Sequence, residues 1–346
     1  MTAPSRLRWW WLALGLVLLG AATLAGVALG AAELPLAGVA AEILNLVPGI
    51  TLESGLTARQ SAIVTEIRLP RVVLALLVGA MLALAGGAYQ GVFRNPLAEP
   101  FLLGVAAGAG LGVTVVIALQ PATASGLPVT TPVAAFTGAL GAVLVTYLLG
   151  AAGGRDRAPE TLILAGVAVA AFLTAMQTYL LQRHVEVIRE VYTWLLGRLG
   201  GATWGDVRML LPYAVVSAVV IVLLGRELDV MSVGDHEASG LGINPQVIRI
   251  VLLAAASLGT AAAVSVSGLI GFVGIIVPHI VRLIFGTSYR VILPLSVVLG
   301  AAFLVLADLA ARTVDIPREV PIGVITAFLG APFFVIVLRA TRRAAL

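Results

Sequence analysis

The stretch IRLPRVVLALLVGAMLALAGGAYQGVFRNPLAEP, residues 67–100, determines the kind of fold. Arg71 and Arg94 enclose 22 residues without a charged side chain, 72–93. A helix needs about 20 apolar residues to cross the hydrocarbon core of a bilayer. We therefore predict a membrane-spanning helix over 67–92, which ends where the two prolines of FRNPLAEP prevent one continuous helix.

The rest of the chain repeats this pattern. Of its 346 residues, 60% are hydrophobic and 11% are charged, whereas a soluble domain averages about 25% charged residues. We predict an all-α, polytopic membrane protein with about ten transmembrane helices in one permease domain, residues 1–346. The 38 glycines suit close helix packing, because lipid does not press helices together. The predicted spans are 9–32, 67–92, 101–119, 128–149, 161–181, 208–225, 249–267, 269–285, 291–311 and 320–339.

The first predicted span and three polar segments set the expected organisation. The apolar run 9–32 is longer than the 7–15 residues of a signal-peptide core, so we expect it to be retained as a span. Residues 33–66 are expected to form an external loop, and 185–204 an outer amphipathic segment. Residues 227–248 are expected to lie inside, with one or two short surface helices broken at Gly240 and Gly242.

Missing residue types exclude several kinds of chemistry. The chain has no cysteine, so thiolate nucleophiles, iron–sulfur clusters and cysteine zinc sites are excluded. All 21 basic residues are arginine, so neither a Walker A lysine nor a Schiff-base lysine is available. The three histidines, His184, His236 and His279, are dispersed and predict no metal site. The arginines flank apolar segments, and this placement predicts a membrane partner rather than nucleic acid.

Arginine placement gives the expected orientation. With the N-terminus inside, twelve arginines fall on the inner side and nine on the outer side. Five of the inner twelve occupy the short terminal segments, so the positive-inside rule favours cytoplasmic termini. The nine outer arginines are unexplained by that rule.

Asp308 and Ser267 are compatible with two other classes of function, a secondary transporter and a membrane-embedded protease. Asp308 lies four residues before Arg312, and the pair can meet on one helix face as a structural ion pair. An ion-coupled secondary transporter would instead use Asp308 as its coupling carboxylate. A membrane-embedded protease would need Ser267 as nucleophile, but no histidine is near it in sequence, and helix packing explains the serine better.

Glycine and proline positions indicate a weak internal repeat. Arg71 precedes an apolar run, the pair Gly86-Gly87 and Asn95-Pro96, whereas Arg249 precedes an apolar run, two glycines and Pro278-His279. The two runs begin on opposite sides of the membrane, as an inverted repeat requires.

Three stretches resemble a known family. They are residues 68–110, beginning RLPR; SGLIGFVGIIVPHIVRLIFG, 267–286; and ADLAAR, 307–312, followed by EVPIGVITAFLGAPFF, 319–334. In this order they resemble the permease subunits of type II, binding-protein-dependent ABC importers for iron chelates, haem and vitamin B12 (the FecCD family). The resemblance covers nearly the whole chain from about Glu66. One departure is GTSYR at 286–290, where many relatives have an Asp-His-Arg sequence, which puts the chemistry of that loop in doubt.

The resemblance implies roles for particular residues. Arg68, Arg71 and Arg312 match outer arginines that dock acidic residues of the substrate-binding protein as exposed charges that steer its approach, which would explain the outer positive charge. The family's ATPase-coupling positions match Glu237, Ala238, Leu241 and Gly242. The short outer gating helix and the pathway match Trp194, Gly197, Leu173, Met176, Gln177 and Leu180.

The resemblance also implies the assembly. The chain would be half of a homodimeric pore in the cell inner (plasma) membrane, surrounded by lipid. It would act with two ATP-binding-cassette subunits, which hold ATP and Mg, and with an extracytoplasmic binding protein. The chain itself would bind no cofactor or metal and have no catalytic residue. It would import a ferric siderophore, haem or cobalamin, which the sequence does not distinguish; the alternative is the ion-coupled secondary transporter.

Overall fold

The computed structural model describes residues 7–30, 34–119, 130–151 and 159–344, and within these ranges all regular structure is helical. Seven described helical segments are long and apolar enough to cross a membrane, and three shorter apolar helices accompany them. Their positions confirm the ten predicted spans, although the ends predicted at 31–32 and 128–129 lie outside the described residues. The long segments are α1 (Trp9–Ala28), α3 to α4 (Ala58–Val92), α6 (Thr130–Ala151), α7 (Pro159–Arg183), α9 (Trp204–Leu223), α12 (Pro245–Ser267) and α14 (Tyr289–Thr313). The shorter ones are α5 (Val105–Leu119), α13 (Val273–Phe285) and the part Ile322–Val337 of α15 (Ile322–Ala344).

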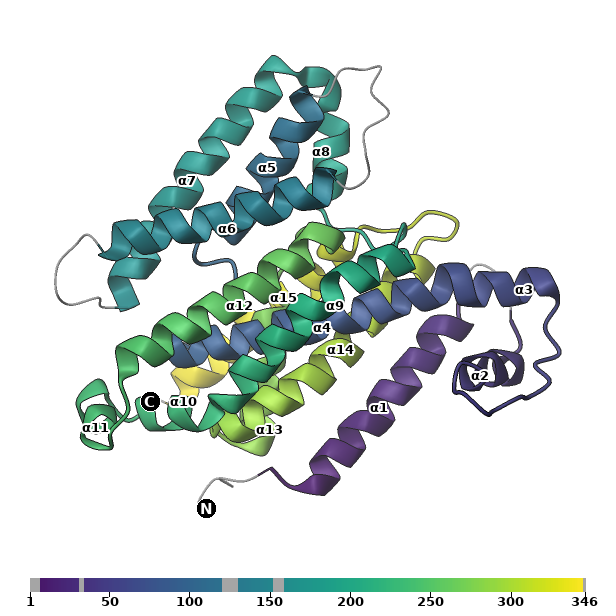
Figure 1. Ribbon diagram of the computed structural model, residues 1–346, viewed down its shortest axis with the longest axis horizontal. Coiled ribbons are helices and arrows are strands. Elements are labelled where there is room, and N and C mark those ends of the chain that lie inside the picture. Colours follow the sequence, from purple (N-terminus) through teal and green to yellow (C-terminus); the bar gives the residue numbers. More distant parts are fainter. Residues whose placement is uncertain (1–6, 31–33, 120–129, 152–158, 345–346) are drawn as a thin grey trace.

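The helices form two layers (Figure 1). Helices α5, α6, α7 and the short α8 (Ile188–Leu195) form one layer, and the other spans form a tilted bundle beneath it. Helix α4 (Leu69–Val92) lies at the centre of that bundle, against α14, α12, α13 and α9. Helix α1 packs along α14, so the first predicted span is an integral part of the bundle.

Glycine allows the central helices to touch backbone to backbone. A side chain at Gly86 of α4 would collide with the backbone of Gly274 on α13. A side chain at Gly79 would collide with the carbonyl oxygen of Gly300 on α14 in the same way. Small residues at such crossings bring backbones close and increase van der Waals contact, which drives helix association in lipid.

One connection between central helices is not helical. Helix α12 ends at Ser267, and the chain continues through Gly268 (φ 70°) to Phe272 (φ 68°), where α13 begins. The carboxylate of Glu99, in the turn after α4, accepts a hydrogen bond from the Phe272 N–H at 3.3 Å. Phe272 in turn packs against Gly330 of α15, where a side chain would collide with its ring. Irregular backbone at membrane depth requires this kind of burial within protein.

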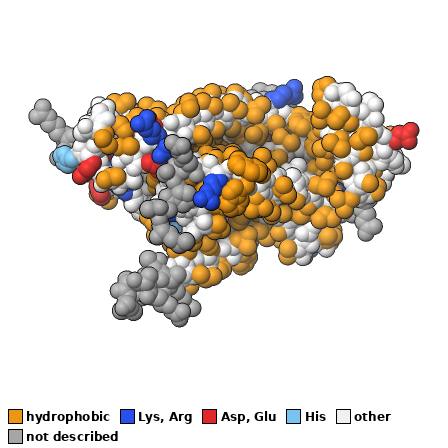
Figure 2. Space-filling view, turned by 90° about the horizontal axis from the view of Figure 1, so that it is seen from below, with side chains coloured by type: hydrophobic (Ala, Val, Ile, Leu, Met, Phe, Trp, Pro, Cys, Tyr) orange, Lys and Arg blue, Asp and Glu red, His pale blue; other side chains and the backbone are white. Residues whose placement is uncertain are grey.

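The outer surface of the bundle is apolar. Figure 2 shows one face covered mainly by hydrophobic side chains, with few charged groups. Leu164, Phe328 and Leu223 are among the large apolar side chains that are more than 70% exposed. Lipid contact explains such a surface, because hydrocarbon imposes no penalty on exposed apolar groups.

The three polar segments contain short helices. The segment 33–66 contains α2 (Leu36–Leu44), α3 (Ala58–Ala62) and the start of a π-helix, η1 (Ile63–Arg68). The segment 185–204 contains a 3₁₀ turn, η2 (Val185–Val187), and α8. The segment 227–248 contains most of α10 (Gly225–Met231) and all of α11 (Asp235–Gly240). The predicted break is confirmed, since α11 ends at Gly240 and Gly242 has φ 81°.

Candidate functional site: the two ends of the central helices

Polar side chains gather at the two ends of α4, which we name the Arg71 end and the Arg94 end. At the Arg71 end, the guanidinium of Arg71 lies between two carboxylates. It donates to both oxygens of Asp308 at 2.9 to 3.0 Å and to both oxygens of Glu319 at 2.8 and 2.9 Å. A planar guanidinium can serve two carboxylates at once because its five N–H donors have a fixed geometry. The carboxylates come from α14 and from the loop before α15, so Arg71 joins three elements.

Two further arginines close the end of α1. Arg68 donates to the carbonyl oxygens of Val27 and Ala28 at 2.9 and 2.7 Å. Arg312 donates to Gly26 O at 2.7 Å, and its Nε lies 3.2 Å from Asp308 Oδ2. The last carbonyls of a helix have no intrahelical partner and carry partial negative charge, so cations are favourable there.

These contacts bury the predicted docking residues. Arg68, Arg71 and Arg312 are only 6%, 8% and 8% exposed, so the expectation of three exposed outer charges is wrong. The cause is the tertiary packing of α1, α4 and α14, which surrounds them with carbonyls and carboxylates. Their role in docking stays a prediction. The exposed arginines at this end, apart from the buried three, are Arg59, Arg183, Arg189, Arg198, Arg208 and Arg318.

The residues of the two alternative functions have structural partners. Asp308 is 1% exposed and is held by Arg71 and Arg312, which is the predicted structural ion pair. A coupling carboxylate must exchange its ion with water, whereas this one is enclosed by two cations. The Ser267 hydroxyl donates to Ala263 O at 2.9 Å, within its own helix. Asp308 and Ser267 therefore have structural roles in stabilising the fold.

The predicted gating segment is packed onto the Arg71 end. Trp194 of α8 is buried against α5, α6 and α12. Gly197 has φ 74°, and a side chain there would lie 2.7 Å from the carbonyl oxygen of Leu269. The loop after α8 is pinned by two backbone bonds, Arg198 N–H to Ser267 O at 2.8 Å and Gly323 N–H to Leu196 O at 3.0 Å. The segment thus contacts the α12–α13 break and the start of α15 together.

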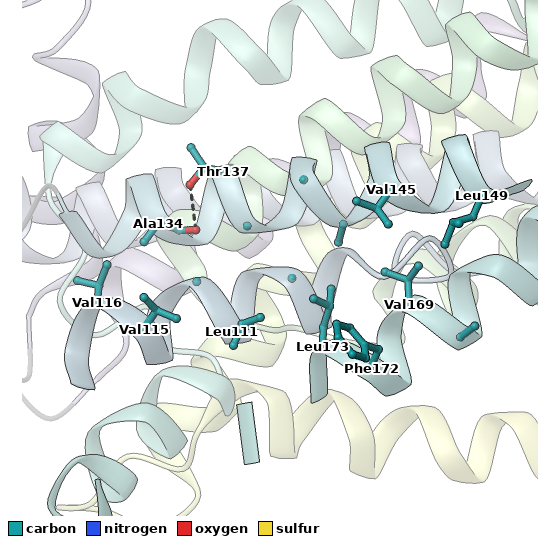
Figure 3. Close-up of a pocket in the computed structure, with 16 residues that line it drawn as sticks. Leu111, Val115, Val116, Ala134, Thr137, Val145, Leu149, Val169, Phe172 and Leu173 are labelled. Carbon is teal, nitrogen blue, oxygen red and sulfur yellow. Dashed lines mark hydrogen bonds between the residues drawn. The ribbon is translucent and has the colours of Figure 1, made fainter. Parts of the chain in front are cut away.

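The predicted pathway residues on α7 lie in different surroundings. Leu173 lines an apolar groove between α5, α6 and α7, with a volume of about 880 Å³ (Figure 3). Met176 is 42% exposed, and Leu180 is half-buried. Gln177 is buried and donates to the Thr114 hydroxyl of α5 at 3.1 Å, so it holds α7 on α5. Their place in a pathway remains a prediction.

The predicted coupling residues lie at the Arg94 end. Ala238 is fully buried and fixes α11 to the bundle, whereas Leu241 is 72% exposed. Gly242 has φ 81°, a conformation that few other residues adopt, and it follows Leu241 in the turn to α12. Glu237 is exposed and folds back over Gly234 at the start of α11.

Sequence reasoning missed Asp235, which lies beside these residues. Its carboxylate pairs with Arg94, in the turn after α4, and with Arg249 of α12 at 3.0 Å. Burial raises the pKa of Asp235, but the hydrogen bonds and charges of Arg249 and Arg94 outweigh it and hold the pKa below its ordinary value. Arg94 also donates from Nε to Met231 O at 2.9 Å, which ties α10 to the same turn.

Sequence reasoning also missed Asp229, Glu99 and Glu319 as contact residues. Asp229 of α10 accepts hydrogen bonds from the Ser288 hydroxyl at 2.7 Å and the Tyr289 N–H at 2.5 Å, at the start of α14. This contact holds the stretch 286–290 against α10. A sequence signal existed for Glu99, since a carboxylate next to a proline and among apolar residues requires a partner when it is buried, whereas Asp229 and Glu319 lie close to other charged residues and carried no such signal.

Comparisons with known proteins agree with this architecture. The model of the FecCD transport family matches residues 16–340. The cobalamin import system permease protein BtuC of Halobacterium salinarum is 43% identical over 86% of this chain and 78% of its own length. The iron(3+)-hydroxamate import system permease protein FhuB of Bacillus subtilis is 38% identical over 95% of this chain and 83% of its own.

A solved structure agrees as well. It shows a metal-chelate type ABC transporter in an inward-facing conformation, with a TM-score of 0.82 and 26% sequence identity. The match covers 95% of this chain and 98% of that one. The chain is therefore a multi-pass membrane permease that belongs to the FecCD transport family.

Proposed function

We propose that this permease is the pore subunit of an ATP-driven importer that carries a metal chelate to the cytoplasm. Two ATPase subunits would bind ATP and Mg²⁺ and would drive the pore through residues 227–248. An extracytoplasmic binding protein would deliver the chelate. The chain itself would bind no cofactor or metal and would catalyse no reaction.

One observation carries the proposal: an exposed apolar patch at the Arg94 end. Val233 and Leu241 flank α11 outside the spans and are 74% and 72% exposed, and Val247, in the first turn of α12, is 51% exposed. Exposed apolar groups rimmed by polar ones mark protein interfaces. A cytoplasmic ATPase is the partner that an importer of this family requires at such a surface.

The orientation follows from the same assignment. The Arg94 end would be cytoplasmic and the Arg71 end extracytoplasmic, in the cell inner (plasma) membrane. Figure 1 places the start of α1 and the end of α15 toward the end that carries α10 and α11. Both termini would then be cytoplasmic, in agreement with the positive-inside rule.

A second copy would complete the pore. Helix α7 exposes a row of large apolar side chains, among them Leu164, Phe172 and Tyr179, at 71%, 66% and 59%. Small residues such as Ala168 and Ala171 lie between them and permit close approach of another helix. We propose that α7 faces α7 of the second copy and that the pathway runs between them.

The chelate class is open within limits. A cobalamin permease and an iron-hydroxamate permease are similar to this chain at 43% and 38% identity, so cobalamin and a ferric siderophore are candidates, and the family resemblance adds haem. The decisive binding experiment screens the cognate binding protein against haemin, cobalamin and several ferric siderophores.

Reconstitution tests the importer as a whole. Uptake into proteoliposomes should require the permease, its ATPase subunit, ATP and the loaded binding protein. Uptake driven by a pH or sodium gradient without the ATPase would overturn the proposal and support an ion-coupled secondary transporter.

A further inference from the structure

Two carboxylates of the 227–248 segment hold the Arg94 ends of three central helices. Asp229 binds the start of α14, and Asp235 binds the end of α4 and the start of α12. Asp229 lies on α10, whose Leu228 and Met231 are buried in the bundle, whereas Asp235 lies on α11, where Ala238 is the buried residue. The segment therefore contacts the bundle through these apolar side chains and through the two aspartates.

The Asp235 contact has the geometry of a three-way junction. Its Oδ1 accepts hydrogen bonds from Arg94 and, at 3.4 Å, from Arg249, and its Oδ2 accepts one from Arg249 at 3.0 Å. Arg94 has φ 48°, a conformation uncommon for residues other than glycine, and it aims its guanidinium at both Asp235 and Met231 O. Arg249 is 7% exposed, so its charge depends on Asp235 for compensation.

The same helices are joined again at the Arg71 end. Arg71 of α4 holds Asp308 of α14 there. Between the two ends, α4 and α14 are in backbone contact at Gly79 and Gly300, and α4 meets α12 where Met81 fills the space beside Gly259. Packed interiors transmit displacement rather than absorb it, because their voids are small. A shift at the Arg94 end should therefore move α4, α12 and α14 as one body.

We propose that Asp235 is the positioning residue that transmits movement of α11 to α4 and α12, with Asp229 making the matching connection to α14. The proposal rests on the proposed function, since it takes α11 as the element that the ATPase moves. It adds the route by which that movement enters the bundle. Asp235 acts through Arg94 and Arg249 and touches neither the chelate nor ATP.

The first measurement is chelate imported per ATP hydrolysed, in proteoliposomes with the full transporter. Asp235→Asn removes the charge and keeps the size, and Arg94→Gln removes one of its partners. Each should lower the ratio at least about fivefold, the lower range of coupling between distant sites. Asp235→Glu keeps the charge and should restore most of the ratio, and the double variant Asp235→Asn/Arg94→Gln should be no worse than either single one. Asp315→Asn, which changes an exposed carboxylate in the loop after α14, is the matched control and should match wild type.

The second measurement follows the gating helix. The chain has no cysteine, so Tyr192→Cys on α8, where the side chain is 55% exposed, gives one labelling site. Its reaction rate with a water-soluble maleimide should change on addition of ATP. The change should be lost in the Asp235→Asn background, whereas a purely structural role would leave the ATP-dependent change intact.

The outcomes separate this proposal from the proposed function. If wild-type permease does not co-purify with its ATPase, the proposed function fails. If Asp235→Asn binds the ATPase and keeps the wild-type ratio, only the transmission role is overturned. It is overturned equally if Asp235→Asn abolishes ATPase binding, because Asp235 would then belong to the interface. If Asp235→Asn does not fold, the chelate imported per ATP hydrolysed by Arg94→Gln and by Asp235→Glu tests the transmission role instead.

Discussion

The guanidinium of Arg71 donates three hydrogen bonds to the carboxylate of Asp308, at 2.9 to 3.0 Å, across 237 residues of sequence. The side chains are 10% and 2% exposed, so the pair is removed from water. A buried ion pair adds little net stability, but loss of one partner leaves an uncompensated buried charge. This relationship governs how the Arg71 end responds to mutation.

Asp308→Asn should destabilise the permease by about 3–5 kcal/mol, because Arg71 and Arg312 lose their shared carboxylate. Thermal unfolding in detergent measures this effect. Asp315→Asn is the control, because Asp315 is exposed in the following loop. A stable Asp308→Asn permease that has lost uptake would instead support the ion-coupled transporter.

The Arg71–Glu319 contact should depend on pH in one direction. Hydrogen bonding by Arg71 holds the pKa of Glu319 below its ordinary value, so ionised Glu319 stabilises the folded state above the pKa of the unfolded chain. That contribution is lost as pH falls through the lowered folded pKa, below about 4.3. At pH 7 the melting temperature of the wild type should be higher than that of Glu319→Gln. The difference between the two melting temperatures should vanish at pH values well below the folded pKa of Glu319. An equal difference at every pH would show that the charge of Glu319 is irrelevant.

Gly86→Ala should cost at least about 3 kcal/mol, the upper range for overpacking, since the obstacle is the Gly274 backbone and not a rotatable side chain. Gly20→Ala is the matched control, because Gly20 of α1 has open space around it. That change should be neutral or stabilise by up to about 1 kcal/mol. Equal melting temperatures for the two variants would contradict the packing at Gly86.

Glu99→Ala should destabilise by about 1.5–3 kcal/mol, the range for a hydrogen bond to a charged group, since the Phe272 N–H loses its acceptor. Glu99→Gln keeps an acceptor oxygen and should retain about half of that stability. Melting temperatures of the three proteins provide the test. If both variants lose the same stability, the carboxylate does not act through Phe272.

Replacement of Arg68, Arg71 and Arg312 by glutamate should weaken capture of the binding protein while ATPase assembly persists. Because the three are buried, the same change should lower the melting temperature. Arg68→Gln is the milder variant, since Arg68 donates to carbonyl oxygens of α1. A pull-down at matched amounts of folded protein separates the two effects. Full capture by folded Arg68→Gln would remove Arg68 from the docking surface.

The sequence by itself determined that the chain lies in lipid, where its helices lie along the chain and which family it belongs to. The 22-residue uncharged run between Arg71 and Arg94 is long enough to cross the bilayer as a helix, which satisfies its backbone hydrogen bonds within the segment, and the same argument holds for the other long apolar runs. Glycine and proline positions located the breaks after α4 and within 227–248, because these residues control backbone conformation locally. Motif order identified the relatives.

Only the tertiary structure decided which charges meet. Arg71 and Glu319 are 248 residues apart, and Arg94 and Asp235 are 141 apart, so neither pair is visible as a sequence pattern. The arginines expected to be exposed at the outer face are buried for this reason, since α1, α14 and the loop before α15 close around them. Burial depends on how helices pack, and packing depends on contacts between residues that are distant in the chain.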